Sequence, residues 1–246
     1  MKSIAVLGFC LLACGVAAEP RPPLLVMTDL WPPFRMLNEQ GELVGLDIDL
    51  LAQLSQRTGL QFEVRRAPWA RGLAALQQGR ADLMAGLAKT PEREQYIEYL
   101  PRPYHVCSPR FYAAPVQARY LRDYAQLEPL QLGYVLESAY FEPFDSDQQL
   151  RKVAVSSEEQ LLEMLVRGRL QAIIGTDCQV DYALRDPRWQ GQIAKAAYAP
   201  AAHTDLYIGF SRQRLRTDDY QLLSQALDEL VREGWVTQAM RAYQAD

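Results

Sequence analysis

The chain has 246 residues, of which 49% are hydrophobic and 23% charged, and its formal net charge at pH 7 is −4. A chain of this size can bury a substantial core, either as one large domain or as two lobes of modest size. Its acidic balance, without a basic stripe, argues against nucleic acid or an anionic membrane surface as a partner.

Residues 1–18 have the features of a cleavable secretion signal. Lys2 supplies the positive start, residues 4–16 the apolar stretch, and Val16-Ala17-Ala18 the small residues before the cleavage site. The apolar run is short for a bilayer span, and no longer run follows it. An alternative is a lipoprotein with its lipid on Cys14, which would leave an unusually short apolar region. We therefore expect an exported protein.

The first strand ends in a stiff aromatic loop. Residues 24–27 are predicted to be a strand, and Trp31-Pro32-Pro33-Phe34 follows it. Two prolines in succession exclude both a helix and a central strand, so Trp31 and Phe34 are expected on a loop. Residues 61–65 alternate like a second strand, and Trp69 lies beyond its end. Both tryptophans are thus expected at strand ends.

Two helices are indicated by their ends. Asp47 and Asp49 are predicted to open an amphipathic helix that Gly59 terminates, since acidic residues favour a helix N-terminus and glycine its C-terminus. A Ser-x-x-Glu capping box, Ser156 to Glu159, precedes a second apolar helix.

A similar unit occurs in both halves of the chain. In residues 77–93, Gly79 is predicted to end an apolar helix, because glycine adopts the left-handed conformation without a Cβ penalty. Residues 83–87 follow as a nearly unbroken apolar run, typical of a strand buried on both faces of a sheet. Residues 165–177 repeat this order, with the same spacing of leucine and the two glycines. We therefore expect two similar lobes facing each other across a cleft.

Prolines mark the expected crossover between the lobes. They surround an aromatic-rich segment at residues 106–113, and residues 199–202 indicate the return. The predicted organisation is a signal at residues 1–18, a first lobe at 19–108 and 205–246, and a second lobe at 109–204.

Two cysteines, Cys107 and Cys178, remain after the signal is removed. An oxidising compartment permits a disulfide between them. The alternative is that both are small buried hydrophobic side chains.

Motifs of common enzymes are missing from the sequence. It has no Gly-x-Ser-x-Gly elbow, no phosphate-binding glycine loop, and no His-x-x-x-His or Cys-x-x-Cys metal pair. The two histidines, His105 and His203, lie beside the expected crossovers, where a hinge or surface role is expected. We therefore expect no catalytic residue, metal or cofactor.

Polar and aromatic residues at the predicted strand ends form a binding constellation instead, because ligands of open α/β sheets lie outside the carboxyl ends of the strands. Its members are Trp31, Trp69 and Arg93 in the first lobe, and Glu137, Thr176 and Asp177 in the second. Structural alternatives exist for each. The tryptophans could pack in the core, Arg93 could pair with neighbouring glutamates on an exposed turn, and the two acids could be caps or surface residues.

Four motifs follow one another along the chain: Trp31-Pro32-Pro33-Phe34, Gly41-Glu42-Leu43-Val44-Gly45-Leu46-Asp47-Ile48-Asp49, Leu76-x-x-Gly79-Arg80-Ala81-Asp82 and Thr90-Pro91-Glu92-Arg93. In their order and spacing they resemble family 3 periplasmic solute-binding proteins, the polar amino acid receptors of ABC uptake systems. The resemblance covers residues 24–243. It implies an α/β, type II periplasmic-binding fold, with two lobes joined by two crossing strands and a ligand cleft between them.

The resemblance also implies roles for particular residues. In the family, the arginine matching Arg93 clamps the ligand's α-carboxylate, and aromatics matching Trp31 and Trp69 sandwich the ligand. Phe34 and Gly86 complete the expected binding set in the first lobe. Two departures are visible. Ala88 stands where the family usually has Thr or Ser, and the family's ammonium-binding Asp aligns with Thr176, so Asp177 needs a one-residue shift to serve.

We therefore expect a monomeric periplasmic protein that captures a small carboxylate-bearing solute, an amino acid or a derivative, for an ABC permease in the inner membrane. One alternative is an enzyme on the same scaffold, because cyclohexadienyl dehydratase resembles this family; Glu137 is the acid to test. A second alternative is a sensor subunit that presents its ligand to a membrane receptor.

Overall fold

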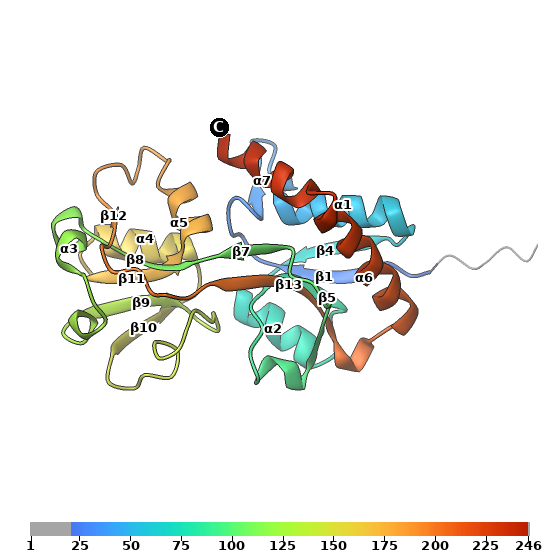
Figure 1. Ribbon diagram of the computed structural model, residues 1–246, viewed down its shortest axis with the longest axis horizontal. Helices are drawn as coiled ribbons and strands as arrows, with labels where there is room; N and C mark the ends of the chain where they lie inside the picture. Colours follow the sequence, from blue (N-terminus) through green and yellow to red (C-terminus); the bar gives the residue numbers. More distant parts are fainter. Residues whose placement is uncertain (1–20, 246) are drawn as a thin grey trace, which may run out of the picture.

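The computed structural model describes residues 21–245, which form two α/β lobes side by side (Figure 1). The predicted signal and the lipidation alternative at Cys14 lie outside the described residues. Within the described part, no helix is both long enough and apolar enough to cross a membrane. The expected two-lobed α/β architecture is confirmed.

The first lobe is built on a mixed sheet with the strand order β4-β1-β5-β13-β6, and β7 pairs with one end of β13. These strands are β1 (Leu24–Thr28), β4 (Phe62–Arg66), β5 (Leu83–Leu87), β6 (Ile97–Tyr99), β7 (His105–Cys107) and β13 (Thr204–Ser211). β1 is parallel to β4 and β5, so their carboxyl ends meet at one edge of the sheet. A small hairpin of β2 (Met36–Leu37) and β3 (Leu43–Val44) follows the aromatic loop.

Helices complete the first lobe. They are α1 (Leu46–Thr58), α2 (Trp69–Gln77), α6 (Thr217–Arg232) and α7 (Trp235–Ala245), with the short 3₁₀ turns η1 (Arg93–Gln95) and η3 (Arg212–Arg214). α1 packs against α6 through Leu50 and Leu54 on one side and Leu223 and Leu227 on the other, all within one buried cluster. The predicted stop at Gly59 is confirmed, since this glycine has a left-handed φ of 73°.

The second lobe has the strand order β10-β9-β11-β8-β12. Its strands are β8 (Pro109–Ala113), β9 (Gln131–Val135), β10 (Arg151–Val155), β11 (Ala172–Thr176) and β12 (Ala194–Lys195); its helices are α3 (Pro115–Tyr120), η2 (Ala125–Leu127), α4 (Glu158–Val166) and α5 (Asp177–Ala183). Successive residues alternate between its faces. Phe111 and Ile174 belong to one buried cluster, and Tyr112 and Ile173 to the cluster on the other side.

The repeated unit predicted from the sequence is present in both lobes. It is α2–β5 in the first lobe and α4–β11 in the second, and Gly79 and Gly168 end the two helices with φ of 63° and 65°. Each strand is parallel to one neighbour and antiparallel to the strand that comes from a crossover.

The N-terminus of α4 is shifted from the predicted capping box by one residue. Ser157, not Ser156, is the N-cap, and its hydroxyl accepts a hydrogen bond from the Gln160 backbone. The Gln160 side chain in turn accepts one from the Ser156 backbone at 3.1 Å. Gln160 thus takes the place of the predicted glutamate, and its side chain reaches the residue before the N-cap rather than the N-cap itself. Glu158 consequently becomes the first residue of the helix.

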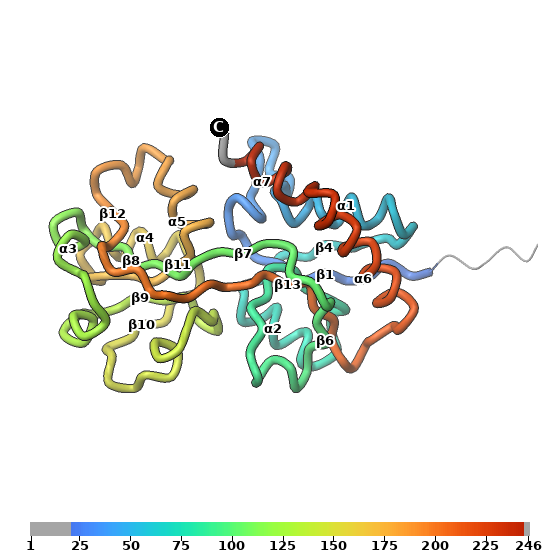
Figure 2. The backbone as a smooth tube through the Cα atoms, in the orientation of Figure 1, coloured from blue at the N-terminus to red at the C-terminus, as the bar shows by residue number. Residues whose placement is uncertain are grey.

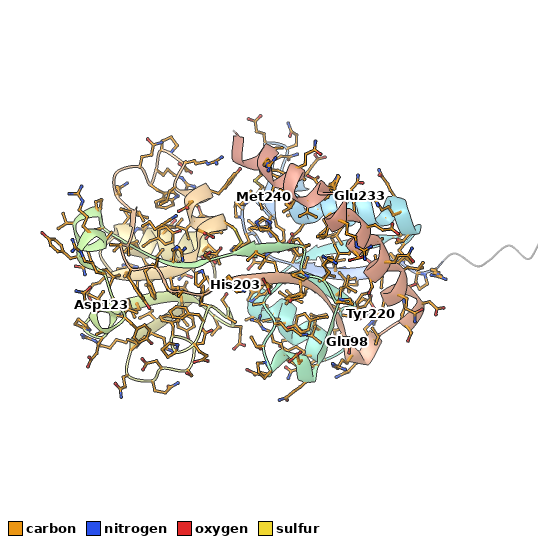
Figure 3. The ribbon with its side chains drawn as sticks, in the orientation of Figure 1. Glu98, Asp123, His203, Tyr220, Glu233 and Met240 are labelled. Atoms are coloured by element: carbon orange, nitrogen blue, oxygen red, sulfur yellow. A yellow bond between two sulfur atoms is a disulfide. The ribbon has the colours of Figure 1, made fainter. Side chains whose placement is uncertain are left out.

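Two segments cross between the lobes. β7 continues into β8, and the return enters β13, which pairs antiparallel with β7 so that Thr204 lies opposite Cys107 and Leu206 opposite His105. Figure 2 shows the two crossing segments between the lobes, and Figure 3 places His203 on the return segment. A disulfide joins Cys107 to Cys178, the second residue of α5, with 5.7 Å between their Cα atoms.

Candidate functional site

A cavity lies between the lobes, with a volume of about 620 Å³ that includes its opening to solvent. Its lining residues follow the carboxyl ends of β1, β5, β9 and β11, as expected for an α/β sheet. They are Asp29, Leu30, Trp31, Arg35, Trp69, Gly86, Ala88 and Arg93 from the first lobe; Val135, Ser138, Ala139, Tyr140, Ser157, Glu158 and Thr176 from the second; and Thr204 and Leu206 from the return crossover.

The aromatic loop after β1 contributes Trp31 but not Phe34. The two rings are stacked, with 4.4 Å between their centres, and Phe34 is fully buried beneath Trp31 in the core of the first lobe. Phe34 is therefore not among the residues that line the cavity, and its expected contact with a ligand stays a prediction. Phe34 supports Trp31 from behind.

Arg35 was not anticipated as a site residue, and it lines the floor of the cavity. Its guanidinium pairs with the carboxylate of Asp47 and donates to the Asp29 carbonyl at 3.0 Å. Tyr104 donates to the other Asp47 oxygen at 2.7 Å. Burial raises the pKa of Asp47, while the charge of Arg35 acts in the opposite direction.

This buried pair places a cation against both predicted ligand-binding tryptophans. The Arg35 guanidinium carbon lies 5.2 Å from the Trp31 ring centre and 5.8 Å from that of Trp69, within cation–π range. A Cβ on Gly86 would stand 2.5 Å from an Arg35 nitrogen, and Gly86 has a left-handed φ of 76°. Glycine at this position therefore leaves the space that the guanidinium occupies.

Arg93 lines the cavity, but it does not lie on an exposed turn as its alternative interpretation required. It opens η1, is 6% exposed, and donates to the Ala88 carbonyl at 2.9 Å and to the Glu137 carbonyl at 2.5 Å. Trp69 donates to the same Glu137 carbonyl at 3.3 Å. Two donors of the first lobe therefore share one acceptor of the second.

Glu137 contributes its backbone rather than its side chain. Its φ is 62°, and among the residues that the structure describes it is the one non-glycine residue with a positive φ. Its side chain is not part of the cavity lining. Such a backbone conformation is costly for a residue with a Cβ. The observed contacts of Glu137 with the first lobe are made by its carbonyl, and a ligand-binding role of its carboxylate stays a prediction.

Thr176 and Asp177, which the sequence left as alternatives for the ammonium-binding position, have different surroundings at the end of β11. Thr176 lines the cavity, is 6% exposed, and its hydroxyl has no hydrogen-bond partner. The Asp177 carboxylate faces away from the lining and accepts from the backbones of Ser108 and Cys178, each at 2.8 Å. Asp177 is thus not among the residues that line the cavity, and its role as an ammonium ligand stays a prediction. Thr204, at the hinge, has a second unpartnered hydroxyl.

Two carboxyl groups, neither of them anticipated, line the opposite part of the cavity. Asp29 accepts hydrogen bonds from the backbones of Leu30 and Trp69, at 2.8 and 2.9 Å. Glu158 comes from the start of α4. Burial and then the charge of Asp29 raise the pKa of Glu158, a hydrogen bond with Trp31 opposes both, and the result is a pKa of about 8. The sequence did contain a signal for Glu158, namely its place at a helix start, but the one-residue error in the cap concealed it.

Among the described residues, His105, Cys107 and Cys178 form a group with metal-ligand spacing, their ligand atoms all within 4.8 Å. The two sulfur atoms are bonded to each other, so neither is the thiolate that a metal requires. Burial lowers the pKa of His105. His105 and Cys107 lie in β7, and the disulfide links this strand to α5.

The family profile described as "Bacterial extracellular solute-binding proteins, family 3" matches residues 24–245. The histidine-binding periplasmic protein of Salmonella typhimurium is 28% identical over 70% of this chain and 69% of its own length. The probable ABC transporter arginine-binding protein ArtJ of Chlamydia trachomatis is 31% identical over 39% of each chain. Several further curated relatives are likewise matched over only about two fifths of their length.

Solved structures also resemble this fold. An ancestral arginine-binding protein bound to arginine has a TM-score of 0.78 at 19% identity and covers 91% of this chain and 98% of its own. A histidine kinase sensor domain with similarity to periplasmic binding proteins has a TM-score of 0.79 at 17% identity, covering 89% and 94%. At these identities the likeness concerns the fold alone.

Proposed function

Because the chain belongs to the bacterial extracellular solute-binding proteins, family 3, we propose that it captures a polar amino acid between its lobes and delivers it to an ABC permease. The curated relatives include arginine- and histidine-binding proteins of such systems, which supports this class of ligand. The organisation of the chain as a first lobe at residues 19–108 and 205–246 and a second at 109–204 is part of the same proposal.

The observation that carries the proposal is the cavity itself. It is formed by strand ends of both lobes, and its lining includes two buried arginines, two tryptophans and two unpartnered threonine hydroxyls. Buried polar groups are normally hydrogen-bonded, so Thr176 and Thr204 are suited to a polar ligand. A guanidinium has five N–H donors, and the carbonyls of Ala88 and Glu137 each accept one. Arg93 therefore retains the capacity to bind a carboxylate.

Ligand capture is expected to reinforce a contact between the lobes that the protein already makes. Arg93 and Trp69 reach the Glu137 carbonyl from across the cleft. A carboxylate beside Arg93 would add its own hydrogen bonds where these three residues meet. Bending at the paired strands β7 and β13 would let the lobes close around the ligand.

The proposal is tested by thermal unfolding of the purified protein against a panel of the common amino acids and small organic acids. A ligand at a hundred times its dissociation constant should add about 2.7 kcal/mol to the free energy of unfolding. Isothermal titration calorimetry of the positive compounds then gives their affinities. If no amino acid raises the unfolding temperature or gives a heat of binding, the proposed function is wrong.

A second candidate function is catalysis on the same scaffold, and one observation favours it. With its pKa raised to about 8, Glu158, which lines the cavity, can carry a proton at neutral pH. A protonated carboxyl group is a suitable general acid for expelling water from a prearomatic ring. Incubation with prephenate or arogenate separates the candidates. Formation of aromatic product would contradict a purely binding role, and its absence would contradict the dehydratase.

A further inference from the structure

The disulfide at the crossover has an imidazole beside it. His105 Nε2 lies 3.6 Å from Cys178 Sγ, and the ligand atoms of His105, Cys107 and Cys178 all lie within 4.8 Å of one another. None of these three residues lines the central cavity. They therefore form a cluster that the proposed capture of an amino acid does not use.

The cluster is assembled from two elements of the fold. His105 and Cys107 are two positions apart in β7, so their side chains point to the same face of the strand. Cys178 is the second residue of α5, which belongs to the second lobe. The ring of Phe34 meets His105 edge-on, with 5.6 Å between the ring centres, and limits the rotation of the imidazole.

Hydrogen bonds hold these two elements together independently of the bond between the sulfur atoms. The Ser108 backbone donates to the Asp177 carboxylate at 2.8 Å, and the Asp177 backbone donates to the Ser108 carbonyl at 2.9 Å. β7 is also paired with β13 on its other side. Reduction of the disulfide therefore leaves two thiols and an imidazole close to one another.

Two thiolates and an imidazole are preferred ligands of zinc, with bond lengths of about 2.3 Å to sulfur and about 2.0–2.1 Å to nitrogen. At tetrahedral angles these bonds place sulfur and nitrogen about 3.6 Å apart, which is the separation of Cys178 Sγ and His105 Nε2. Two thiolates also neutralise the charge of Zn²⁺, as a site with a largely buried ligand requires; Cys107 is 2% exposed. The fourth position of the ion is left for water.

We propose that His105, Cys107 and Cys178 bind one zinc ion when the disulfide is reduced. A thiol reductant supplies two electrons and two protons to the sulfur–sulfur bond and is itself oxidised to a disulfide. Zinc then replaces the protons of the two cysteine thiols, and these protons pass to solvent. The metal ion and the disulfide are thus alternative links between β7 and α5.

Cobalt titration tests the site, because Co²⁺ is a coloured substitute for zinc. The protein is reduced under argon with a water-soluble phosphine, which takes oxygen from water and becomes the phosphine oxide. Co²⁺ should then produce a thiolate charge-transfer band and the visible bands of a tetrahedral site. Both should saturate at one equivalent and disappear when one equivalent of Zn²⁺ is added. The oxidised protein should show neither band. Absence of the bands from the reduced protein overturns the proposal.

Stability and thiol reactivity provide a second readout with zinc itself. One equivalent of Zn²⁺ should raise the unfolding temperature of the reduced protein by at least about 3 °C and leave that of the oxidised protein unchanged. It should also protect both thiols from iodoacetamide, as counted by mass spectrometry, until a chelator is added. If reduction alone unfolds the protein, zinc should restore its native circular dichroism. Zinc that neither stabilises nor protects the reduced protein overturns the site.

Variants identify the ligands. Cys178→Ser should lose most of the thiolate band, and His105→Gln should weaken zinc binding at least about tenfold while both thiolates remain. His203→Gln, which changes the other histidine of the chain, is the matched control and should bind zinc like the parent. Circular dichroism checks that each variant is folded. Unchanged zinc affinity in His105→Gln, or an equal loss in His203→Gln, would contradict the assigned ligands.

Discussion

At one end of the cavity, Arg93 donates hydrogen bonds to carbonyl groups of both lobes, at 2.9 and 2.5 Å. At the other end, burial and the charge of Asp29 together raise the pKa of Glu158 to about 8. The protein supplies acceptors for the basic side chain, whereas at the acidic end it buries Glu158 beside a second carboxyl group. The basic end therefore joins the lobes, and the acidic end makes the free energy of unfolding depend on pH.

The largest expected effect is at the basic end. Arg93→Ala should weaken amino acid binding by on the order of a hundredfold, because two charged hydrogen bonds to a carboxylate are lost. Arg93→Lys should recover only part, since lysine lacks the planar fork. The buried position of Arg93 also predicts a lower free energy of unfolding without ligand, by about 1.5–3 kcal/mol. Calorimetry and urea unfolding measure the two effects.

The control for this prediction is Arg71→Ala, which removes an exposed arginine from α2 in the same lobe. It should change neither affinity nor stability appreciably. An affinity of Arg93→Ala within about threefold of the parent would mean that the carboxylate clamp is misassigned.

The tryptophans join the two ends and should show an intermediate effect. Trp31→Ala removes a ring that stacks on Phe34 and lies over Arg35, so affinity should fall about tenfold while the fold persists. Trp69→Phe retains an aromatic ring but loses the hydrogen bond to Glu137, and its effect should be smaller. Calorimetry with circular dichroism distinguishes lost binding from lost structure. A larger loss of affinity in Trp69→Phe than in Trp31→Ala would mean that Trp69, not Trp31, contributes more to ligand binding.

At the acidic end, Glu158 should make the free energy of unfolding without ligand depend on pH. The pKa of Glu158 is raised from 4.5 to about 8, so the folded state favours the neutral carboxyl group. Its contribution is fully present below pH 4.5 and is lost as the pH rises through 8. The glutamine of Glu158→Gln remains neutral at every pH. The free energy of unfolding of this variant should therefore increase relative to that of the parent as the pH rises from 4.5 to 8.5. Urea unfolding across this range measures the difference; a constant gap would show that Glu158 is not perturbed.

The smallest expected effect concerns Ala88, beside Arg93. Its side chain lines the cavity, and its carbonyl accepts from both Arg93 and Tyr99. Ala88→Thr adds a hydroxyl next to the proposed carboxylate position. If an α-amino acid binds with its carboxylate at Arg93, the change should be tolerated or should tighten binding by up to about threefold. A marked loss of affinity in calorimetry would place the carboxylate elsewhere.

The sequence predicted those features that depend on local patterns. Gly79 and Gly168 end their helices in the left-handed conformation, and the apolar runs after them become central strands, because these preferences act over a few residues. The polar residues at strand ends were therefore placed near a common cleft. This local reasoning is sufficient for Trp31, Trp69 and Arg93 to be found in the cavity lining.

The remaining site residues depend on contacts that cross the fold. Arg35 is placed by Asp47, twelve positions along the chain, and by Tyr104 behind it, so no local pattern marks it as part of the cavity floor. Glu158 enters the cavity because the cap of α4 lies at Ser157, a one-residue choice that the Ser-Ser sequence left ambiguous. Arg93 is buried by a carbonyl of the other lobe, which only the arrangement of the lobes provides.

The disulfide between Cys107 and Cys178 makes the mechanics of the hinge depend on the cellular compartment. It fastens the end of β7 to the start of α5, and the hydrogen bonds between Ser108 and Asp177 lie directly beside it. Where thiols are kept reduced, this covalent link is absent. A chain retained in a reducing compartment would therefore carry the cavity without the covalent link between the crossover and the second lobe.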